Sequence, residues 1–197
     1  MKSKRILGLA AMLSLLLAVQ TGAYTVQQGD TMWRIAAKHE VGTSELITAN
    51  PQVEDPNLIY PGQELTIPEE DTAVRAWEKE VVRLVNEERA KYGLSALTEN
   101  WELSRVARYK AQDMCDNHYF SHTSPIYGSP FTMMSNFGIS YRTAGENIAM
   151  GYATPERVVA AWMNSSGHRA NILNSTYTEI GVGYVTEGHY CSQMFRS

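Results

Sequence analysis

EIGVGYVTEGHYCSQMFR, residues 179–196, is the stretch that decides the fold of this 197-residue chain. Two sets of residues alternate in it, Ile180, Val182 and Tyr184 before a Glu187-Gly188 turn, and Tyr190, Ser192 and Met194 after it. A period of two is typical of a strand with one buried face, and a glycine-containing turn joins two such strands. The stretch therefore predicts a β-hairpin near the C-terminus.

Three amphipathic helices are predicted to cover the sheet to which this hairpin belongs. The first occupies residues 73–92 and stops at Gly93, and the second spans 101–117. The third begins at Thr154-Pro155-Glu156, an N-cap followed by proline in the first turn. Helices layered on a mostly antiparallel sheet form an α+β sandwich, which is the fold class that we expect.

Residues 24–68 have a separate pattern, which predicts a small βααβ module. A short strand precedes Gly29-Asp30-Thr31, a turn and N-cap signal for a helix over 32–39. A second helix opens at Thr43, and an alternating strand closes the module. We expect its core to contain Trp33, Ile35, Leu46 and Leu65. A short polar joint, residues 69–72, connects it to residues 73–197.

Residues 1–23 have the composition of a secretory leader. The basic start MKSKR precedes an apolar run, and small residues end the segment at Ala23. The run is shorter than a membrane span requires, so we expect export and cleavage, with no stable membrane span left afterwards. An uncleaved anchor is the alternative.

The charge of the chain argues against nucleic acid as a partner. Cleavage after Ala23 would move the formal charge from −4 to −7, because three basic residues and no acidic residue leave with the leader. An acidic chain without a basic cluster lacks the electrostatic footprint of a nucleic-acid-binding protein.

Cys115 and Cys191 are the two cysteines of the chain. Export permits a disulfide between them, which would close a long loop and stabilise the fold by roughly 4 kcal/mol. We expect this disulfide. A pair that stays reduced is the alternative.

The N-terminal module resembles a known glycan-binding family. YTVQQGDTMWRIA, ITANP and NLIYPGQELTIP occur in the order typical of a LysM module. The resemblance implies binding to glycans that contain N-acetylglucosamine, either peptidoglycan or a chitin-like glycan. The binding residues that it implies lie on two facing loops: Gly29, Asp30, Thr31 and Met32 on one, and Asn50, Pro51, Asn57, Leu58 and Ile59 on the other.

Few polar residues in the larger domain suit chemistry. His118 and His122 lie in HYFSHTSP, Glu146 in AGENIAMG and His168 in SGHRANIL. Imidazoles and one carboxylate suit zinc with an open position for water, and they also suit general acid–base catalysis. Spacing alone does not decide among a zinc site, acid–base catalysis and a purely structural role.

The same stretches together resemble a second family. NHYFSHTSP, GENIAMG, GHRANIL, EIGVGY and YCSQMF occur in the order typical of the CAP superfamily (cysteine-rich secretory, antigen 5 and pathogenesis-related proteins). The resemblance implies an α-β-α sandwich over residues 73–197, with a central cleft that holds two histidines and two acids. His122, Glu146 and His168 match three of these positions, whereas His118 lies outside the pattern and is interpreted as structural.

The fourth position of the family pattern is missing. Trp162 is followed by Met163, Asn164 and Ser165, where the second acid would stand. The remaining set could still hold Zn²⁺ or another divalent metal, with lower affinity. We expect the Asn164–Gly167 break to project His168 into the cleft. The alternative is that His168 only caps a helix beginning at Arg169.

Three functions agree with these residues. The first is a secreted, cell-wall-associated protein that binds peptidoglycan through LysM and a ligand or metal through its CAP cleft. The second is a metal-assisted hydrolase of wall or protein substrates, with His122, Glu146 and His168 as candidate catalytic residues. The third is a protein of envelope or spore-coat assembly, with protein partners. The family resemblance supplies no established reaction.

Overall fold

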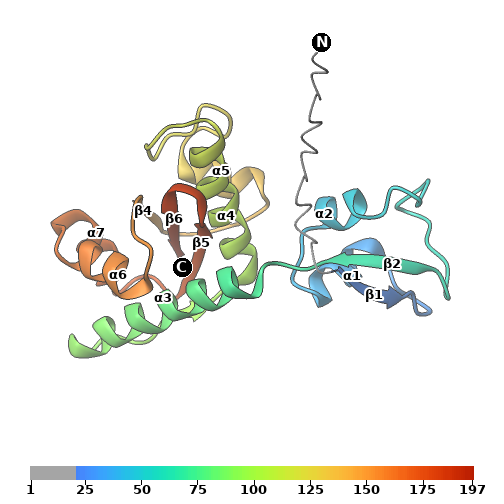
Figure 1. Ribbon diagram of the computed structural model, residues 1–197. Coiled ribbons are helices and arrows are strands. Elements are labelled where there is room, and N and C mark those ends of the chain that lie inside the picture. The colour runs from blue at the N-terminus through green and yellow to red at the C-terminus, as the bar shows by residue number, and fades with distance from the viewer. Residues whose placement is uncertain (1–20) are drawn as a thin grey trace, which may run out of the picture.

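The computed structural model describes residues 21–197, which form a small N-terminal module and a larger α+β domain (Figure 1). The predicted leader lies outside the described residues except for Thr21, Gly22 and Ala23. Within residues 21–197, no helix has both the length and the apolar character that crossing a membrane would require.

The N-terminal module has the predicted βααβ order. Strand β1 (Thr21–Thr25) pairs antiparallel with β2 (Glu64–Pro68), and helices α1 (Met32–Lys38) and α2 (Thr43–Thr48) lie between them in the chain. Thr31 caps α1 by accepting a hydrogen bond from the Arg34 amide, as the turn signal predicted. The core of the module includes Met32, Ile35, Leu46, Leu65 and Ile67.

The prediction that Trp33 belongs to this core is wrong. Its side chain is 67% exposed, whereas Met32, one position earlier, is 3% exposed. Successive residues of an α-helix differ by about 100° around its axis, so the cap at Thr31 sets which side chains face inward. With the helix starting there, Met32, Ile35 and Ala36 face the core and Trp33 faces solvent.

The larger domain contains helices on a four-stranded sheet. Its helices are α3 (Thr72–Lys91), α4 (Trp101–Asp116), α5 (Pro130–Asn136), α6 (Pro155–Met163) and α7 (Ser166–Ile172). Its strands are β3 (Thr98–Glu99), β4 (Ala144–Ala149), β5 (Glu179–Val185) and β6 (Tyr190–Arg196), with the short helix η1 (Glu187–His189) between the last two. The three predicted helices and the C-terminal hairpin are confirmed, and so is the α+β class.

The predicted hairpin is the centre of the sheet. The strand order is β3-β5-β6-β4, and only the short β3–β5 pair is parallel. The left-handed conformation of Gly188, with φ of 67°, makes the tight turn between β5 and β6. β4 lies at one edge, and its partner is β6.

The two faces of the sheet carry different layers. Gly181 and Gly183 of β5 touch the backbone of α4, so a Cβ at either position would overlap that helix. Their ladder partners Met194 and Ser192 share that face. The opposite face, with Ile180, Val182, Tyr184, Cys191 and Phe195, packs on α3 and α6. Figure 1 shows α4 and α6 on the two sides of the strands.

The structure has Cys115 and Cys191 as separate free thiols, which contradicts the predicted disulfide. Cys191 lies on the face of β6 that packs on α3 and α6, whereas Cys115 belongs to α4 on the other face. The sheet separates them. The Cys115 sulfur lies 3.7 Å from the Glu187 carbonyl oxygen, and burial raises the pKa of both thiols.

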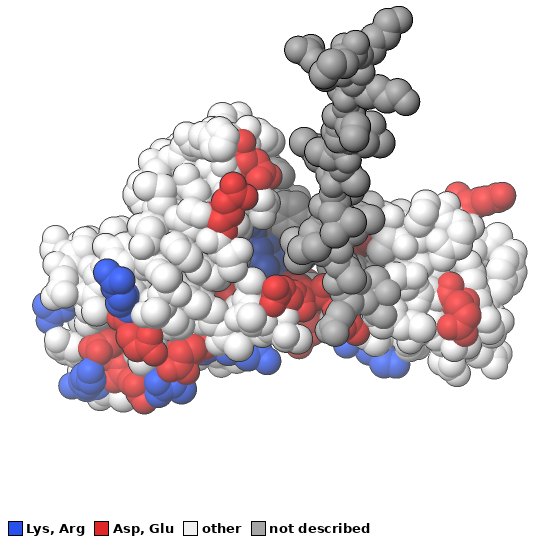
Figure 2. All heavy atoms as spheres, viewed as in Figure 1, with Lys and Arg blue, Asp and Glu red and all other residues white. Residues whose placement is uncertain are grey.

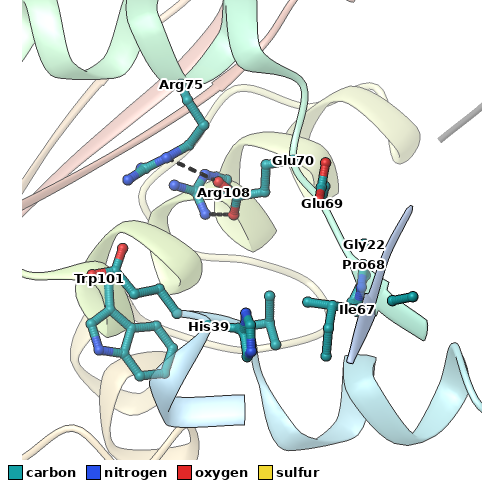
Figure 3. A pocket seen from close by; sticks show the side chains of 12 residues that line it. Gly22, His39, Ile67, Pro68, Glu69, Glu70, Arg75, Trp101 and Arg108 are labelled. Carbon is teal, nitrogen blue, oxygen red and sulfur yellow. Dashed lines mark ion pairs between the residues drawn. The ribbon is translucent and has the colours of Figure 1, made fainter. Parts of the chain in front are cut away.

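A charged junction joins the two domains. Arg105 of α4 donates to Glu45 of α2, with 2.8 Å between Nη2 and Oε2, and the Tyr109 hydroxyl donates to the same carboxylate at 2.9 Å. Glu70, in the connecting segment, pairs with Arg75 and Arg108 beside a cavity of about 430 Å³ (Figure 3). Helix α4 therefore contacts the N-terminal module through Glu45 and the connecting segment through Glu70.

Charges of both signs mix on the visible surface. Figure 2 shows acidic and basic side chains side by side along α3, where Arg83 pairs with Glu80 and Glu87. Such exposed pairs contribute little to stability. The face in Figure 2 carries no large basic patch.

We expect two free thiols per chain. The native protein, unfolded in guanidinium without reductant, should release two equivalents of chromophore from a thiol-reactive disulfide reagent, because the sheet keeps Cys115 and Cys191 apart. The reduced protein is the control and should give the same value. A value near zero before reduction would contradict the free-thiol arrangement.

Candidate functional site

The structure brings two of the predicted site residues into contact. Glu146 lies in the middle of β4, and His122 lies in the segment after α4. The His122 Nδ1 is 2.7 Å from the Glu146 Oε2. The Glu146 carboxylate is buried, whereas the His122 side chain is 52% exposed. The pair therefore has a fixed acidic partner inside and an imidazole that solvent can reach.

The turn after α4 positions His122. His118 adopts a left-handed conformation, with φ of 51°, and the Tyr119 amide donates back to the Met114 carbonyl. The chain reverses there and runs back toward β4. His118 takes part in this turn through its backbone, and its side chain is exposed.

A buried polar network anchors the same segment. Lys110, which is fully buried, donates to the Tyr119 hydroxyl at 2.9 Å, and that hydroxyl donates to Asp113. The Ser124 hydroxyl donates to the same Asp113 carboxylate at 2.7 Å. Each buried polar atom in this set has a partner, as burial requires. Sequence reasoning missed this network because Lys110 and Asp113 look like ordinary charges of an amphipathic helix.

Both oxygens of the Glu146 carboxylate are engaged. Oε2 faces His122, and Oε1 accepts a hydrogen bond from the Ser192 hydroxyl at 3.1 Å. The hydrogen bond to Glu146 raises the pKa of His122, although partial burial and the Lys110 charge act in the opposite direction. The charge-assisted contact thus holds the imidazole through Nδ1. The other ring nitrogen, Nε2, stays available.

His168 approaches the edge strand from the other side of the sheet. It is the third residue of α7, which begins at Ser166 with Ser165 as N-cap. The alternative that His168 caps a helix beginning at Arg169 is therefore wrong. Burial, together with the charge of His122, lowers the pKa of His168. Its ring lines an apolar cavity beside Trp162 and Ile148.

Amide side chains hold α7 against β4. Asn147 donates to the His168 carbonyl at 3.1 Å and to the Gln193 Oε1 at 2.9 Å. Asn171 donates to the Glu146 carbonyl at 3.1 Å and to the Asn147 Oδ1 at 2.9 Å. At the other end, buried Arg89 donates to the carbonyls of Ile172 and Asn174 at 2.7 and 2.9 Å. These contacts fix the backbone that carries His168.

The residues present do not fit a three-ligand zinc centre. Among residues 21–197, no three His, Cys, Asp or Glu side chains gather closely enough to hold a metal ion. Glu146 already engages His122 and Ser192, and the position of the second family acid carries Met163, Asn164 and Ser165. We therefore derive no step through a metal.

The predicted glycan-binding residues divide into support and surface. Met32 and Asn50 are buried, and the Asn50 amide bridges α2 and β2 by bonds to Leu46 and Thr66. Asp30 accepts from the Gln27 amide and the Tyr24 hydroxyl, which lowers its pKa. The exposed members are Gly29, Thr31, Pro51, Asn57 and Leu58, with Ile59 partly exposed. Trp33 and Tyr60 are also exposed, but they do not belong to the predicted set of glycan-binding residues.

Comparisons with known proteins identify both parts of the chain. The family model described as CAP, cysteine-rich secretory protein family, matches residues 82–195, and the LysM domain model matches residues 24–68. The uncharacterized protein YkwD of Bacillus subtilis (strain 168) is 60% identical over 124 residues, which are 63% of this chain and 48% of that protein. The uncharacterized membrane protein YlbC of the same organism is 40% identical over 118 residues, 60% of this chain and 34% of that protein.

A solved structure agrees with the fold. An extracellular protein containing a SCP domain from Bacillus anthracis str. Ames superposes with a TM-score of 0.61 and 29% identity, covering 69% of this chain and 47% of that one. The chain thus spans about half of this protein and of YkwD, and about a third of YlbC.

We expect Glu146→Gln to lower the pKa of His122. The neutral amide cannot stabilise a charged imidazole as the carboxylate does, while burial still opposes the charge. Titration of the His122 ring signals by NMR measures the shift. Glu156→Gln, an exposed change at the start of α6, is the control.

The direction in which the stability of the fold changes with pH follows from the same pair. The folded-state pKa of His122 lies above its ordinary value near 6.5, so the pair stabilises the fold fully below that pH. The contribution disappears as the pH rises through the raised pKa. An unchanged His122 titration in Glu146→Gln would show that the contact does not exist in solution.

Proposed function

The chain belongs to the CAP family, the cysteine-rich secretory protein family, with a LysM domain before the CAP domain, and we propose that it is a secreted protein of the bacterial cell wall. In this proposal the LysM domain binds peptidoglycan and the CAP cleft at β4 binds a ligand. LysM domains are associated with glycans such as peptidoglycan and chitin. The extracellular Bacillus anthracis relative supports the location.

One observation carries the glycan-binding part of the proposal. Hydrogen bonds within the module support the two loops that the family uses to bind glycans. Buried Asn50 ties α2 to β2, and Asp30 closes the β1–α1 turn. Glycan N-acetyl groups need backbone donors and acceptors and a shallow apolar surface. Gly29 and Asn57 are exposed residues of these loops, and Leu58 offers an exposed apolar side chain.

Export agrees with the arrangement of the LysM domain. Cleavage after Ala23 would shorten β1 but leave Tyr24 and Thr25 paired with Leu65 and Glu64. The hydrogen bond from the Tyr24 hydroxyl to Asp30, at 2.8 Å, would also remain. The loop that faces the glycan therefore keeps its support in the cleaved chain.

We expect Leu58→Ser to weaken binding to insoluble peptidoglycan about fivefold, which corresponds to about 1 kcal/mol. Leu58 is 54% exposed on the binding loop, so the change removes apolar contact without opening the core. Sedimentation of the protein with purified sacculi, over a range of sacculus concentrations, measures it.

Ile126→Ser is the matched control, since Ile126 is another exposed aliphatic residue and lies in the CAP domain. It should bind as the native chain does. Equal binding by Leu58→Ser and the native chain would refute this loop as the glycan site.

The contact between His122 and Glu146 favours a second function, hydrolysis without a metal. Glu146 accepts the Nδ1 proton of His122 and fixes the tautomer that leaves Nε2 as a base. Nε2 takes a proton from water while the water oxygen bonds to a carbonyl carbon. The same proton then passes to the leaving nitrogen or oxygen as the bond to the carbonyl carbon breaks.

We expect His122→Ala to lower the release of new amino groups from wall peptides or a protein substrate by about a hundredfold, if the pair acts as a base. His168→Ala should also lower it, because His168 lines the adjoining cavity. Both variants should keep their binding to sacculi, which depends on the LysM domain.

His118→Asn is the control. Asparagine tolerates the left-handed conformation at this exposed turn, so activity should be unchanged. A native chain that releases no amino groups above a boiled sample would leave the CAP cleft with binding alone.

A further inference from the structure

A mostly apolar cavity opens beside His168. Its volume is about 310 Å³. Ile148 of β4 and Trp162 of α6 form its inner wall, and Ala161 lines it from the same helix. His168 and Ser165 supply the polar part of the lining.

The inner wall is rigid. Trp162 is 1% exposed, and its indole nitrogen donates to the Ile148 carbonyl at 3.2 Å. That bond joins α6 to the edge strand and satisfies both polar groups, so the wall has no unpaired atom facing the cavity from this contact. A cavity with a fixed wall has a defined shape for its occupant.

Exposed apolar side chains lie at its mouth. Phe120 is 49% exposed and Met150 is 46% exposed, and both line the cavity. Phe120 lies two residues before His122 in the chain. A group that enters the cavity would therefore cover apolar surface that is now in water, and it would lie next to the His122–Glu146 pair.

The position on β4 relates the cavity to that pair. Ile148 follows Glu146 by two residues, which is about 7 Å along a strand. One residue of an extended polypeptide spans roughly half of this distance. A polypeptide carries polar amide groups for His122 and His168 and an apolar side chain for the cavity, whereas a glycan has no apolar group of this size.

We propose that the cavity binds one bulky apolar side chain, aromatic or branched aliphatic, of a polypeptide held in the CAP cleft. The volume supports a single side chain. A cavity of about 150 Å³ holds benzene, so one of about 310 Å³ has room for an indole or a substituted phenyl ring. This inference rests on the proposed ligand-binding role of the cleft and names its ligand class.

The test uses the full chain and two blocked tripeptides, acetyl-Ala-Trp-Ala-amide and acetyl-Ala-Ala-Ala-amide. Binding is followed by NMR through the ring signals of His122 and His168. We expect the tryptophan peptide to bind at least about tenfold more tightly than the alanine peptide. Equal affinities, or no binding of the tryptophan peptide, would overturn the inference.

Two variants of α6 locate the binding. Ala161→Phe fills the cavity and should weaken the tryptophan peptide about tenfold or more, whereas Ala160→Phe adds the same ring at the neighbouring, exposed position and should have no effect. Phe120→Ser, a change at the mouth that leaves the core intact, should weaken binding about threefold. Unchanged affinity in both Ala161→Phe and Phe120→Ser would overturn the inference.

Two further measurements separate this inference from the proposed function. Ala161→Phe should bind sacculi as the native chain does. A failure of the native chain to bind sacculi would count against the LysM proposal alone. A long-chain fatty acid serves as a competing probe. Binding of the fatty acid that Ala161→Phe abolishes, without binding of the tryptophan peptide, would assign the cavity to a lipid and overturn the polypeptide.

Discussion

The close contact between α4 and β5 is the constraint on which the rest of the CAP domain depends. Gly181 and Gly183 have no side chains, so the helix backbone rests directly on the strand. Any larger residue would push α4 away from the sheet. Because α4 is held this closely, the turn at its C-terminal end delivers His122 to Glu146, two strands away in the sheet. The contact between His122 and Glu146 thus depends on backbone packing as much as on its own hydrogen bond.

Successive side chains of the edge strand β4 point to opposite faces of the sheet. Glu146 points to the face covered by α4, while Asn147 points to the face covered by α7. Consecutive residues of one strand therefore anchor the two histidines from opposite sides. The anchoring is polar and buried, and a buried amide that loses its partner costs about 1–3 kcal/mol. Such a network keeps α7 in one place, which a purely apolar contact would specify less strictly.

The sequence predicted what local pattern controls. The alternation in residues 179–196 and the caps at Thr31 and Thr154 predicted strands and helices correctly, and the order of motifs identified both domains. Features set by packing in three dimensions were missed. Trp33 is outside the core because the cap fixes the helix phase, and the thiols are apart because a sheet lies between them. The contact of His122 with Glu146 joins two residues that the motifs had singled out, whereas its support by Lys110 and Asp113 has no signal in a linear pattern.

Helix α4 also links the His122–Glu146 pair to the LysM domain. Its Arg105 and Tyr109 contact Glu45 of the LysM domain, and its Arg108 pairs with Glu70 of the joint. Its Lys110, two residues after Arg108, supports the segment that carries His122. The side chains of Arg105 and Glu45 are 20% and 27% exposed, so solvent screens their attraction less than at an open surface. A tether raises the local concentration of a second ligand only when its geometry spans both sites. Docking through α4 replaces a flexible tether by a fixed spacing, so the His122–Glu146 pair lies at a set distance from the loops of the LysM domain.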